Sequence, residues 1–233
     1  MNKEDLISVV LPCYNEQGNI IPLIEVIHKE LFFCLHEIIV VDDSSPDGTF
    51  NLVKSKSYDF VRVFLRTSDA SFAKSIRKGI EEAKGNIIVI MDSDFNHQPK
   101  YLPQLVRNIA FYDCVYASRF VYGGGMNNVF RNFFSWAFNL FIRVLTRTYV
   151  TESLYGYISI KKEIISKLNY DKIFWGKGDY CIRLTYYLQK EKVSILQIPA
   201  VNGERLSGEG NRKFIKTFIL YTKETLKLRF SGN

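Results

Sequence analysis

The chain has 233 residues, 47% of them hydrophobic and 15% aromatic, which is enough apolar material for a sizeable core and excludes a disordered protein. Its 31 basic and 24 acidic residues give a net charge of +7, which favours an anionic partner such as a nucleic acid, a phosphorylated substrate or an acidic membrane face. The four cysteines form no CxxC pair, the first residues lack the apolar stretch of a secretory signal, and no window reaches about 18 consecutive apolar residues. We therefore expect reduced thiols in a cytoplasmic protein, with no zinc site, no signal peptide and no spanning helix.

The first half of the chain alternates short apolar runs with amphipathic segments. This alternation, with short connections, predicts an α/β fold whose mostly parallel sheet carries helices on both faces. Because crossovers between parallel strands are right-handed, the carboxyl ends of these strands should share one edge of the sheet. Strands are predicted at 6–11, 38–41, 60–65, 87–91 and 114–117, and helices at 19–33, 50–56, 71–84 and 99–110, with Asn19 capping the first helix.

Carboxylates follow two of these predicted strands. Asp42 and Asp43 end the run at 38–41, and Asp92 and Asp94 follow the run at 87–91. Each group alone could be an ordinary solvated turn, but their convergence on one edge of the sheet is harder to explain in that way. Carboxylate oxygens are hard ligands that suit Mg²⁺ or Mn²⁺ carrying a diphosphate.

The composition changes after residue 125. Residues 126–149 predict a helix that is apolar almost all round, with Trp136 and with arginines at 131, 143 and 147. Residues 213–230 mix apolar and basic side chains in a similar way. Each segment could be a core helix or an amphipathic helix lying in a membrane surface.

Five segments together resemble the polyprenyl-phosphate mannose synthases, a branch of the inverting nucleotide-sugar glycosyltransferases with the GT-A fold. The resemblance runs from about residue 6 to 213 and implies a Rossmann-like GT-A sheet with C-terminal amphipathic interface helices. It further implies a single glycosyltransferase domain, 1–233, with a nucleotide-sugar-binding half at 1–125 and an acceptor and membrane-interface half at 126–233. The segments are LPCYNEQGN at 11–19, VDDSSPDGT at 41–49, MDSDFNHQP at 91–99, ASR at 117–119 before a glycine-rich loop, and RNFFSWAFN at 131–139.

The resemblance also implies roles for individual residues. The metal, Mg²⁺ or Mn²⁺, is assigned to Asp92, Asp94 and Asn96. Catalytic roles fall to Asp94, Arg119, Arg131 and Ser135. The nucleotide sugar is assigned to Pro12, Tyr14, Glu16, Asp43, Asp92 and Arg205, and the acceptor phosphate to Arg119, Arg131, Ser135 and Asn139.

The implied reaction moves a sugar from GDP-mannose or a UDP-sugar to a polyprenyl phosphate, with inversion and with a divalent metal. A phosphomonoester is already anionic at neutral pH, so orientation and charge neutralisation can replace a general base. The resemblance places the protein on the cytoplasmic face of a membrane, bound peripherally by its own helices or through a membrane-anchoring partner protein. Nucleic acid is not expected as a partner because no reading motif accompanies the basic residues.

Three departures from the family pattern point to an altered donor or acceptor. Ser71-Phe72-Ala73 stands where the family has Gly-Leu-Gly, and Glu152 stands where it has an aspartate ahead of Gly156. The family's closing Ser-Lys pair is absent, with Arg212 and Lys213 nearby as its only counterparts.

Two alternatives stay open at this point. Transfer to a glycan hydroxyl would need a general base, for which Asp179 in WGKGDYCIR is the candidate, although a helix N-cap is the favoured explanation of this residue. The other alternative is a non-catalytic subunit of a glycosyltransferase complex. The retained acidic motifs count against this second reading.

Overall fold

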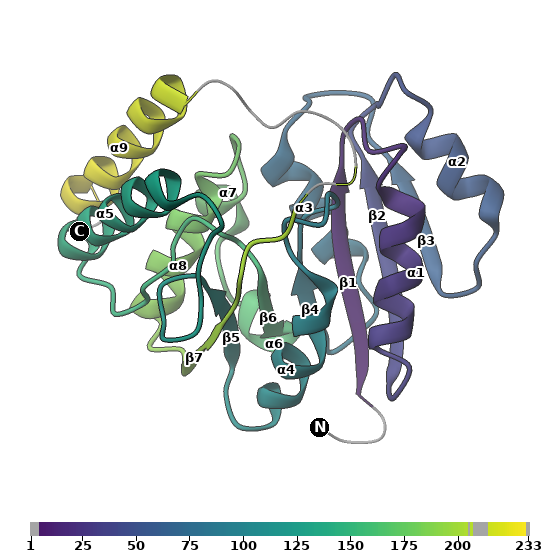
Figure 1. The fold of residues 1–233 in the computed structure, drawn as a ribbon, viewed down its shortest axis with the longest axis horizontal. Helices are drawn as coiled ribbons and strands as arrows, with labels where there is room; N and C mark the ends of the chain where they lie inside the picture. Colours follow the sequence, from purple (N-terminus) through teal and green to yellow (C-terminus); the bar gives the residue numbers. More distant parts are fainter. Residues whose placement is uncertain (1–4, 205, 207–213, 232–233) are drawn as a thin grey trace.

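The structure is a computed structural model that describes residues 5–204, 206 and 214–231. Within these residues seven strands form one sheet, in which only the sixth strand runs antiparallel to its neighbours. This sheet confirms the predicted mostly parallel α/β architecture (Figure 1). The strands are β1 (Leu6–Cys13), β2 (Leu35–Asp42), β3 (Val61–Leu65), β4 (Ile87–Ile90), β5 (Cys114–Ser118), β6 (Ile158–Lys161) and β7 (Ile195–Pro199), in the order β3-β2-β1-β4-β6-β5-β7.

Each central strand is apolar on both faces because a layer of helices covers each face. In β1, Ile7, Val9 and Leu11 belong to one core cluster and Val10 to the other, and none of the four is exposed. Burying one such side chain contributes roughly 1.5–3 kcal/mol, so the two layers supply most of the driving force for folding. The first layer contains α1 (Ile20–Glu30), α2 (Thr49–Lys56) and α4 (Leu102–Arg107), and the second α3 (Phe72–Glu82), α6 (Lys162–Ile165), α7 (Tyr170–Ile173) and α8 (Tyr180–Lys190).

Two longer helices, α5 (Val129–Thr146) and α9 (Phe214–Ser231), lie side by side at one end of the molecule (Figure 1). The rings of Phe138 and Phe218 join them, with centroids 4.8 Å apart. Helix α5 is shorter than predicted: Asn128 caps its first turn through a 2.8 Å bond from the Arg131 N–H, and Arg147 ends it in a left-handed conformation. Among the described helices, none combines the length and apolar character required to cross a membrane.

Two local predictions were wrong. The helix predicted at 99–110 is divided into a 3₁₀ turn (Pro99–Tyr101), α4 and a second 3₁₀ turn (Asn108–Ala110), because Pro103 has no N–H and is accommodated in the first turn of α4. Asn19 precedes α1 but makes no side-chain cap; its amide donates to a Glu16 carboxylate oxygen at 2.5 Å instead.

Glu37 is a buried carboxylate that ties β2 to its surroundings. It accepts hydrogen bonds from the Ser8 hydroxyl and the Lys84 N–H, both at 2.6 Å, and from Arg62 at 3.1 Å. Burial alone would raise the pKa of Glu37, but these donors and the Arg62 charge outweigh burial, so the pKa lies below its ordinary value.

This lowered pKa predicts a pH-dependent contribution to stability. The unfolded carboxyl binds a proton more readily than the folded one, so the stabilisation is complete above the ordinary glutamate pKa and is lost as the pH falls through the folded pKa. We expect Glu37→Gln to lower the free energy of unfolding by about 2 kcal/mol at pH 7, with the difference from wild type narrowing below about pH 4.5. Urea denaturation at pH 7, 5 and 4 measures this, and a difference that does not change with pH would contradict it.

Candidate active site

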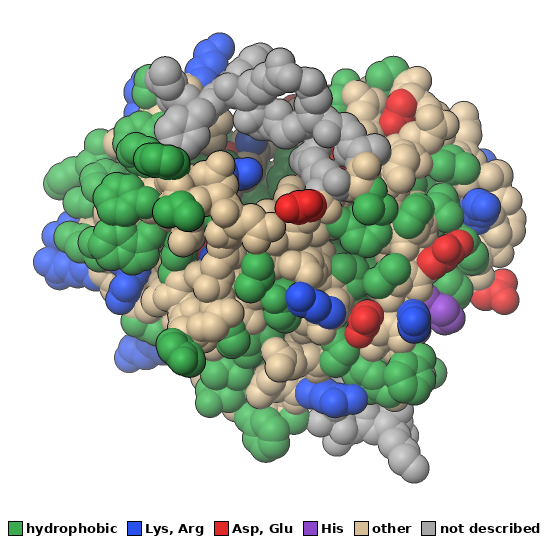
Figure 2. Space-filling model, in the orientation of Figure 1, with side chains coloured by type: hydrophobic (Ala, Val, Ile, Leu, Met, Phe, Trp, Pro, Cys, Tyr) green, Lys and Arg blue, Asp and Glu red, His purple; other side chains and the backbone are tan. Residues whose placement is uncertain are grey.

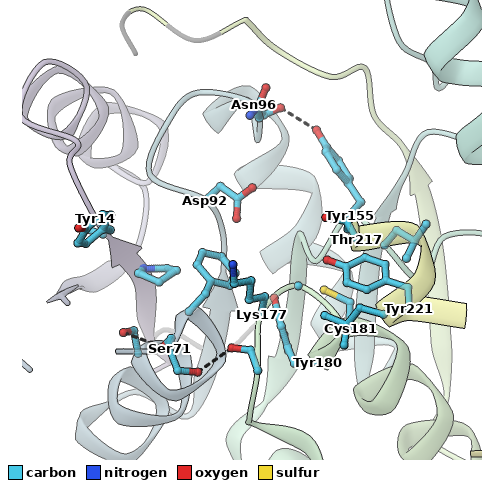
Figure 3. Close-up of a pocket in the computed structure, with 18 of the residues that line it drawn as sticks. Tyr14, Ser71, Asp92, Asn96, Tyr155, Lys177, Tyr180, Cys181, Thr217 and Tyr221 are labelled. Carbon is cyan, nitrogen blue, oxygen red and sulfur yellow. Dashed lines mark hydrogen bonds between the residues drawn. The ribbon is translucent and has the colours of Figure 1, made fainter. Parts of the chain in front are cut away.

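A cleft of about 1310 Å³ opens at the carboxyl edge of the sheet, where the topology was expected to gather the acidic motifs. Figure 2 shows this hollow between the two halves of the molecule, and Figure 3 shows the side chains inside it. It is larger than a site for one small ligand requires, so it has room for two ligands at once. Its lining includes Pro12, Tyr14, Asp43 and Asp92 from the first half of the chain and Arg131 and Lys177 from the second.

The loops after β1 and β2 form the first wall of the cleft. Tyr14 is 57% exposed there, as expected for an aromatic surface that stacks on a ligand. Asp43 is fixed from two sides, accepting 2.6 Å hydrogen bonds from Arg66 and from the Ser71 N–H. Glu16, predicted to face the nucleotide, is instead buried: its carboxylate accepts from the Asn19 amide, and its N–H donates to the hydroxyl of Thr49, the first residue of α2, at 3.0 Å. This carboxylate holds the loop in shape and does not line the cleft.

The loop after β4 presents the predicted metal motif. Asp92 and Asn96 line the cleft, whereas Asp94 is only 2% exposed. The two oxygens of Asp94 accept hydrogen bonds from the Asn96 N–H at 3.0 Å and from the Asn96 amide at 2.7 Å. Asp94 therefore shapes the turn that aims Asn96 into the cleft.

His97 supports this loop from below, a role that sequence reasoning did not assign. Its Nδ1 accepts the Asp92 N–H at 2.8 Å, so its Nε2 carries the proton that is donated to the Tyr155 carbonyl at 2.7 Å. Burial lowers the pKa of His97 to about 3, which keeps the ring neutral at physiological pH. The Tyr155 hydroxyl donates to the Asn96 carbonyl at 2.8 Å, so the metal-motif loop is held at both ends.

The side-chain oxygens of this loop suit a divalent cation that binds together with the phosphates of a substrate. The side chain of Asp92 is 34% exposed, and carboxylate and amide oxygens are the hard donors that Mg²⁺ and Mn²⁺ prefer. Within the described residues no three His, Cys, Asp or Glu side chains are grouped as a complete metal cage. Such a cage is not required, because Mg²⁺ commonly takes one or two protein carboxylates and completes its shell with substrate phosphates and water.

Two of the four residues predicted to hold the acceptor phosphate, Arg119 and Asn139, are bonded to Glu152, which is completely buried. Arg119 donates to this carboxylate at 2.7 and 3.0 Å, and the Asn139 amide donates at 3.1 Å. Ser135 accepts from Arg119 at 3.5 Å. Arg131 is the member of the predicted set that lines the cleft.

The geometry separates the roles within this set. The side-chain oxygen of Asn139 accepts a hydrogen bond from the Ser153 N–H at 2.8 Å, and its side-chain nitrogen donates to Glu152. Both ends of the Asn139 amide are therefore occupied, and this residue is placed to hold Glu152. Arg119 lies one layer below the cleft surface, with one guanidinium nitrogen 3.4 Å from the sulfur of Met126, a residue of the lining. A phosphate can therefore meet Arg131 directly, whereas Arg119 lies behind a flexible thioether.

Asp179, the candidate general base of the hydroxyl-transfer alternative, is fully buried. One of its oxygens accepts from Arg183 at 2.5 Å and the other from the Lys177 N–H at 2.7 Å, and it makes no side-chain N-cap. A general base must reach the proton that it abstracts, so this placement argues against that role. Asp179 does occupy the N-cap position of α8, although its side chain makes no capping hydrogen bond.

The remaining predicted groups divide between the described and undescribed parts of the chain. Arg205, Arg212 and Lys213 lie outside the described residues. Ser71 lines the cleft and caps α3, accepting the Lys74 N–H at 3.3 Å, and its hydroxyl donates to the Gly176 carbonyl at 2.7 Å. The replacement of the family's first glycine thus adds a bridge between the two halves of the molecule.

The fold and the position of the acidic motifs define a glycosyltransferase of the GT-A class. Among solved structures, glucosyl-3-phosphoglycerate synthase from Mycobacterium tuberculosis has this fold: its complex with Mn²⁺ and UDP-glucose superposes with a TM-score of 0.73 at 20% identity, covering 97% of this chain and 79% of that one. A complex of the same enzyme with Mg²⁺ and UDP gives 0.70 at 21% identity, covering 97% and 79%.

The chain belongs to glycosyl transferase family 2, whose family model matches residues 8–168. It is 28% identical to a dolichol-phosphate mannosyltransferase of Pyrococcus furiosus over 95% of this chain, and it spans 63% of the length of that relative. It is 27% identical to the dolichol-phosphate mannosyltransferase of Saccharomyces cerevisiae, covering 97% of this chain and 89% of that protein. An undecaprenyl-phosphate mannosyltransferase of Micrococcus luteus is 29% identical over 74% of each chain.

Proposed function

We propose that this protein transfers a sugar from a nucleotide sugar, GDP-mannose or a UDP-sugar, to a polyprenyl phosphate, with inversion. The observation that carries the proposal is that one cleft is lined by Asp92 and Asn96 from the first half of the chain and by Arg131 from the second. Carboxylate and amide oxygens suit a metal-bound diphosphate, and an arginine fork suits a phosphomonoester. The names of the relatives described above agree with this pairing of donor and acceptor.

The donor half is proposed to be residues 1–125. Tyr14 offers an exposed ring for the nucleotide base, and Asp43 offers an oxygen whose position is fixed by Arg66. Asp92 and Asn96, with Asp94 holding the turn between them, would hold Mg²⁺ or Mn²⁺. A divalent cation there would neutralise charge on the departing nucleoside diphosphate.

The acceptor half is proposed to be residues 126–233, assisted by Arg119. Arg131 would orient the lipid phosphate, and Arg119, held in place by Glu152, would donate a further hydrogen bond to it once the Met126 side chain moves aside. The phosphate is anionic at neutral pH, so its oxygen can attack the anomeric carbon without a protein base. The buried and paired state of Asp179 agrees with a reaction that does not use one.

The second half also supplies a surface suited to a lipid-bound acceptor. Helix α5 exposes Phe130 (80%), Phe133 (60%) and Trp136 (46%), and Figure 2 shows hydrophobic side chains gathered at the end of the molecule where α5 and α9 lie. Monomeric proteins rarely expose a contiguous apolar patch of this kind without a binding role. We propose that this surface rests on the cytoplasmic face of a membrane, peripherally, and presents Arg131 to the phosphate of an embedded lipid.

A flotation experiment tests the proposed membrane surface. Wild-type protein is expected to float with anionic liposomes, and Phe133→Ser with Trp136→Ser is expected to reduce the floating fraction about tenfold or more, because two interfacial aromatic side chains are lost. The matched control is Phe32→Ser with Phe111→Ser, which removes two aromatic side chains that are 83% and 81% exposed in other parts of the fold. Equal losses in both double variants would contradict a specific surface, and a wild type that does not float would leave only the route through a membrane-anchoring partner.

The reaction itself is tested with a panel of nucleotide sugars and Mn²⁺, with and without a short-chain polyprenyl phosphate. The proposal predicts release of nucleoside diphosphate from one donor, dependent on the lipid phosphate. Release that depends instead on a glycan hydroxyl acceptor would favour the polysaccharide alternative. No release with any donor or acceptor would favour a non-catalytic subunit.

A further inference from the structure

The loop between α7 and α8, residues 174–179, lines the side of the cleft formed by the second half of the chain and is held by a buried arginine. Arg183 is 1% exposed, and its guanidinium group donates to the Ile173 carbonyl at 2.8 Å, to the Trp175 carbonyl and to Asp179. The same group stacks on the Trp175 ring, 3.8 Å from its centroid. This one side chain therefore fixes both ends of the loop.

The middle of the loop is equally constrained. The Gly176 carbonyl accepts the Ser71 hydroxyl at 2.7 Å, and the Lys177 N–H donates to Asp179 at 2.7 Å. Gly176 has φ +75°, which favours glycine, and a Cβ on Gly178 would lie 2.3 Å from the Tyr221 hydroxyl oxygen. The backbone around Lys177 is thus set by contacts on every side.

Lys177 is the residue that this rigid loop offers to the cleft. Its side chain is exposed, and it extends into the same cavity as Asp92 (Figure 3). Another lysine of the lining, Lys74, is paired with Asp69. In contrast, no described side chain forms an ion pair or hydrogen bond with the Lys177 ammonium group. An uncompensated positive charge on a side chain that extends from a fixed backbone is suited to binding an anion.

We infer that Lys177 binds an oxyanion of the donor, either the diphosphate or a carboxylate on the transferred sugar. The donor is favoured over the acceptor because the loop is bridged to Ser71, whose N–H in turn donates to Asp43 on the donor wall. Arg131, on α5, is the corresponding exposed cation on the acceptor side. This inference rests on the proposed use of a nucleotide sugar, but binding of the donor can be measured without any acceptor.

The test is titration calorimetry of the Lys177→Gln variant in the presence of Mn²⁺, with three ligands measured in turn. These are a nucleoside diphosphate, a nucleotide sugar whose sugar is uncharged, and a nucleotide sugar whose sugar is a uronic acid. Losing a hydrogen bond to a charged group should raise Kd roughly tenfold, and Lys177→Arg should restore most of the affinity because it keeps the charge. The matched control, Lys172→Gln, changes an exposed lysine five positions upstream that does not line the cleft, and it should leave Kd unchanged.

The outcomes separate the sources of the oxyanion. A weaker Kd for the nucleoside diphosphate assigns Lys177 to the diphosphate, whereas a weaker Kd confined to the uronic acid donor assigns it to the sugar carboxylate. Unchanged Kd values for all three ligands, with tight binding by the wild type, would overturn the inference while leaving the proposed function intact. If the wild type binds no nucleotide at all, the proposed function fails and this inference fails with it.

Discussion

Replacing Asp92 with asparagine is expected to lower the rate of sugar transfer by about 10²- to 10³-fold, the largest effect on activity that we predict. Asp92 is the carboxylate of the segment MDSDFNHQP that lines the cleft, so it is the one placed to share a cation with the donor diphosphate. The amide has nearly the same shape but no charge, and it would bind the cation far more weakly. Initial rates measured over a range of Mn²⁺ concentrations should show the loss, with partial recovery at high Mn²⁺.

A second carboxylate serves as the control for this substitution. Asp171 has a side chain that is 83% exposed and pairs with Arg77 on the surface of α7, so Asp171→Asn should leave the rate and its Mn²⁺ dependence unchanged. Both variants should unfold at the wild-type temperature within a few degrees. A normal rate for Asp92→Asn, or an equal fall for the two variants, would contradict the role of Asp92.

Glu152→Gln is expected to lower the free energy of unfolding by about 3–5 kcal/mol, the largest effect on stability that we predict. Glu152 and Arg119 are 0% and 8% exposed, and the substitution leaves the arginine charge buried without its partner. Glutamine preserves the volume, so a cavity does not explain the loss. Urea denaturation measures it.

The control for Glu152 is an exposed glutamate. Glu163, on α6, makes no ion pair with a described residue, and Glu163→Gln should change stability by less than about 0.5 kcal/mol. Glu152→Asp retains the charge, so its loss of stability should fall between the losses for Glu163→Gln and Glu152→Gln. A loss below about 1 kcal/mol for Glu152→Gln would show that Arg119 finds another partner or water, and would remove Glu152 from the support of the acceptor site.

The first half of the sheet could be predicted because its strands are mostly apolar runs separated by helices of clear periodicity. Strands β6 and β7 were not predicted. Strand β6 pairs with β4 and β5, which are distant from it in the chain. No local pattern signals an antiparallel insertion of that kind, because its stability comes from contacts across the sheet.

The candidate site was predicted at the level of motifs and only partly at the level of individual side chains. Strand ends identify Asp43 and Asp92 because topology brings them to one edge. Which carboxylate faces the cleft depends on turn geometry, so Glu16 and Asp94 were assigned outward although they are buried. The support given by His97 and the exposed charge of Lys177 depend on contacts with distant segments, and neither residue stands out in its local sequence.

The most direct measurement is analysis of the lipid extract after incubation of wild-type protein with nucleotide sugar, Mn²⁺ and a short-chain polyprenyl phosphate. We expect a single new lipid, a sugar joined through phosphate to the polyprenyl chain, with an anomeric configuration opposite to that of the donor. Its formation should stop when the metal is chelated and should fall about 10²-fold or more with Asp92→Asn. Consumption of the donor with no lipid-linked sugar, or a product of retained configuration, would contradict it.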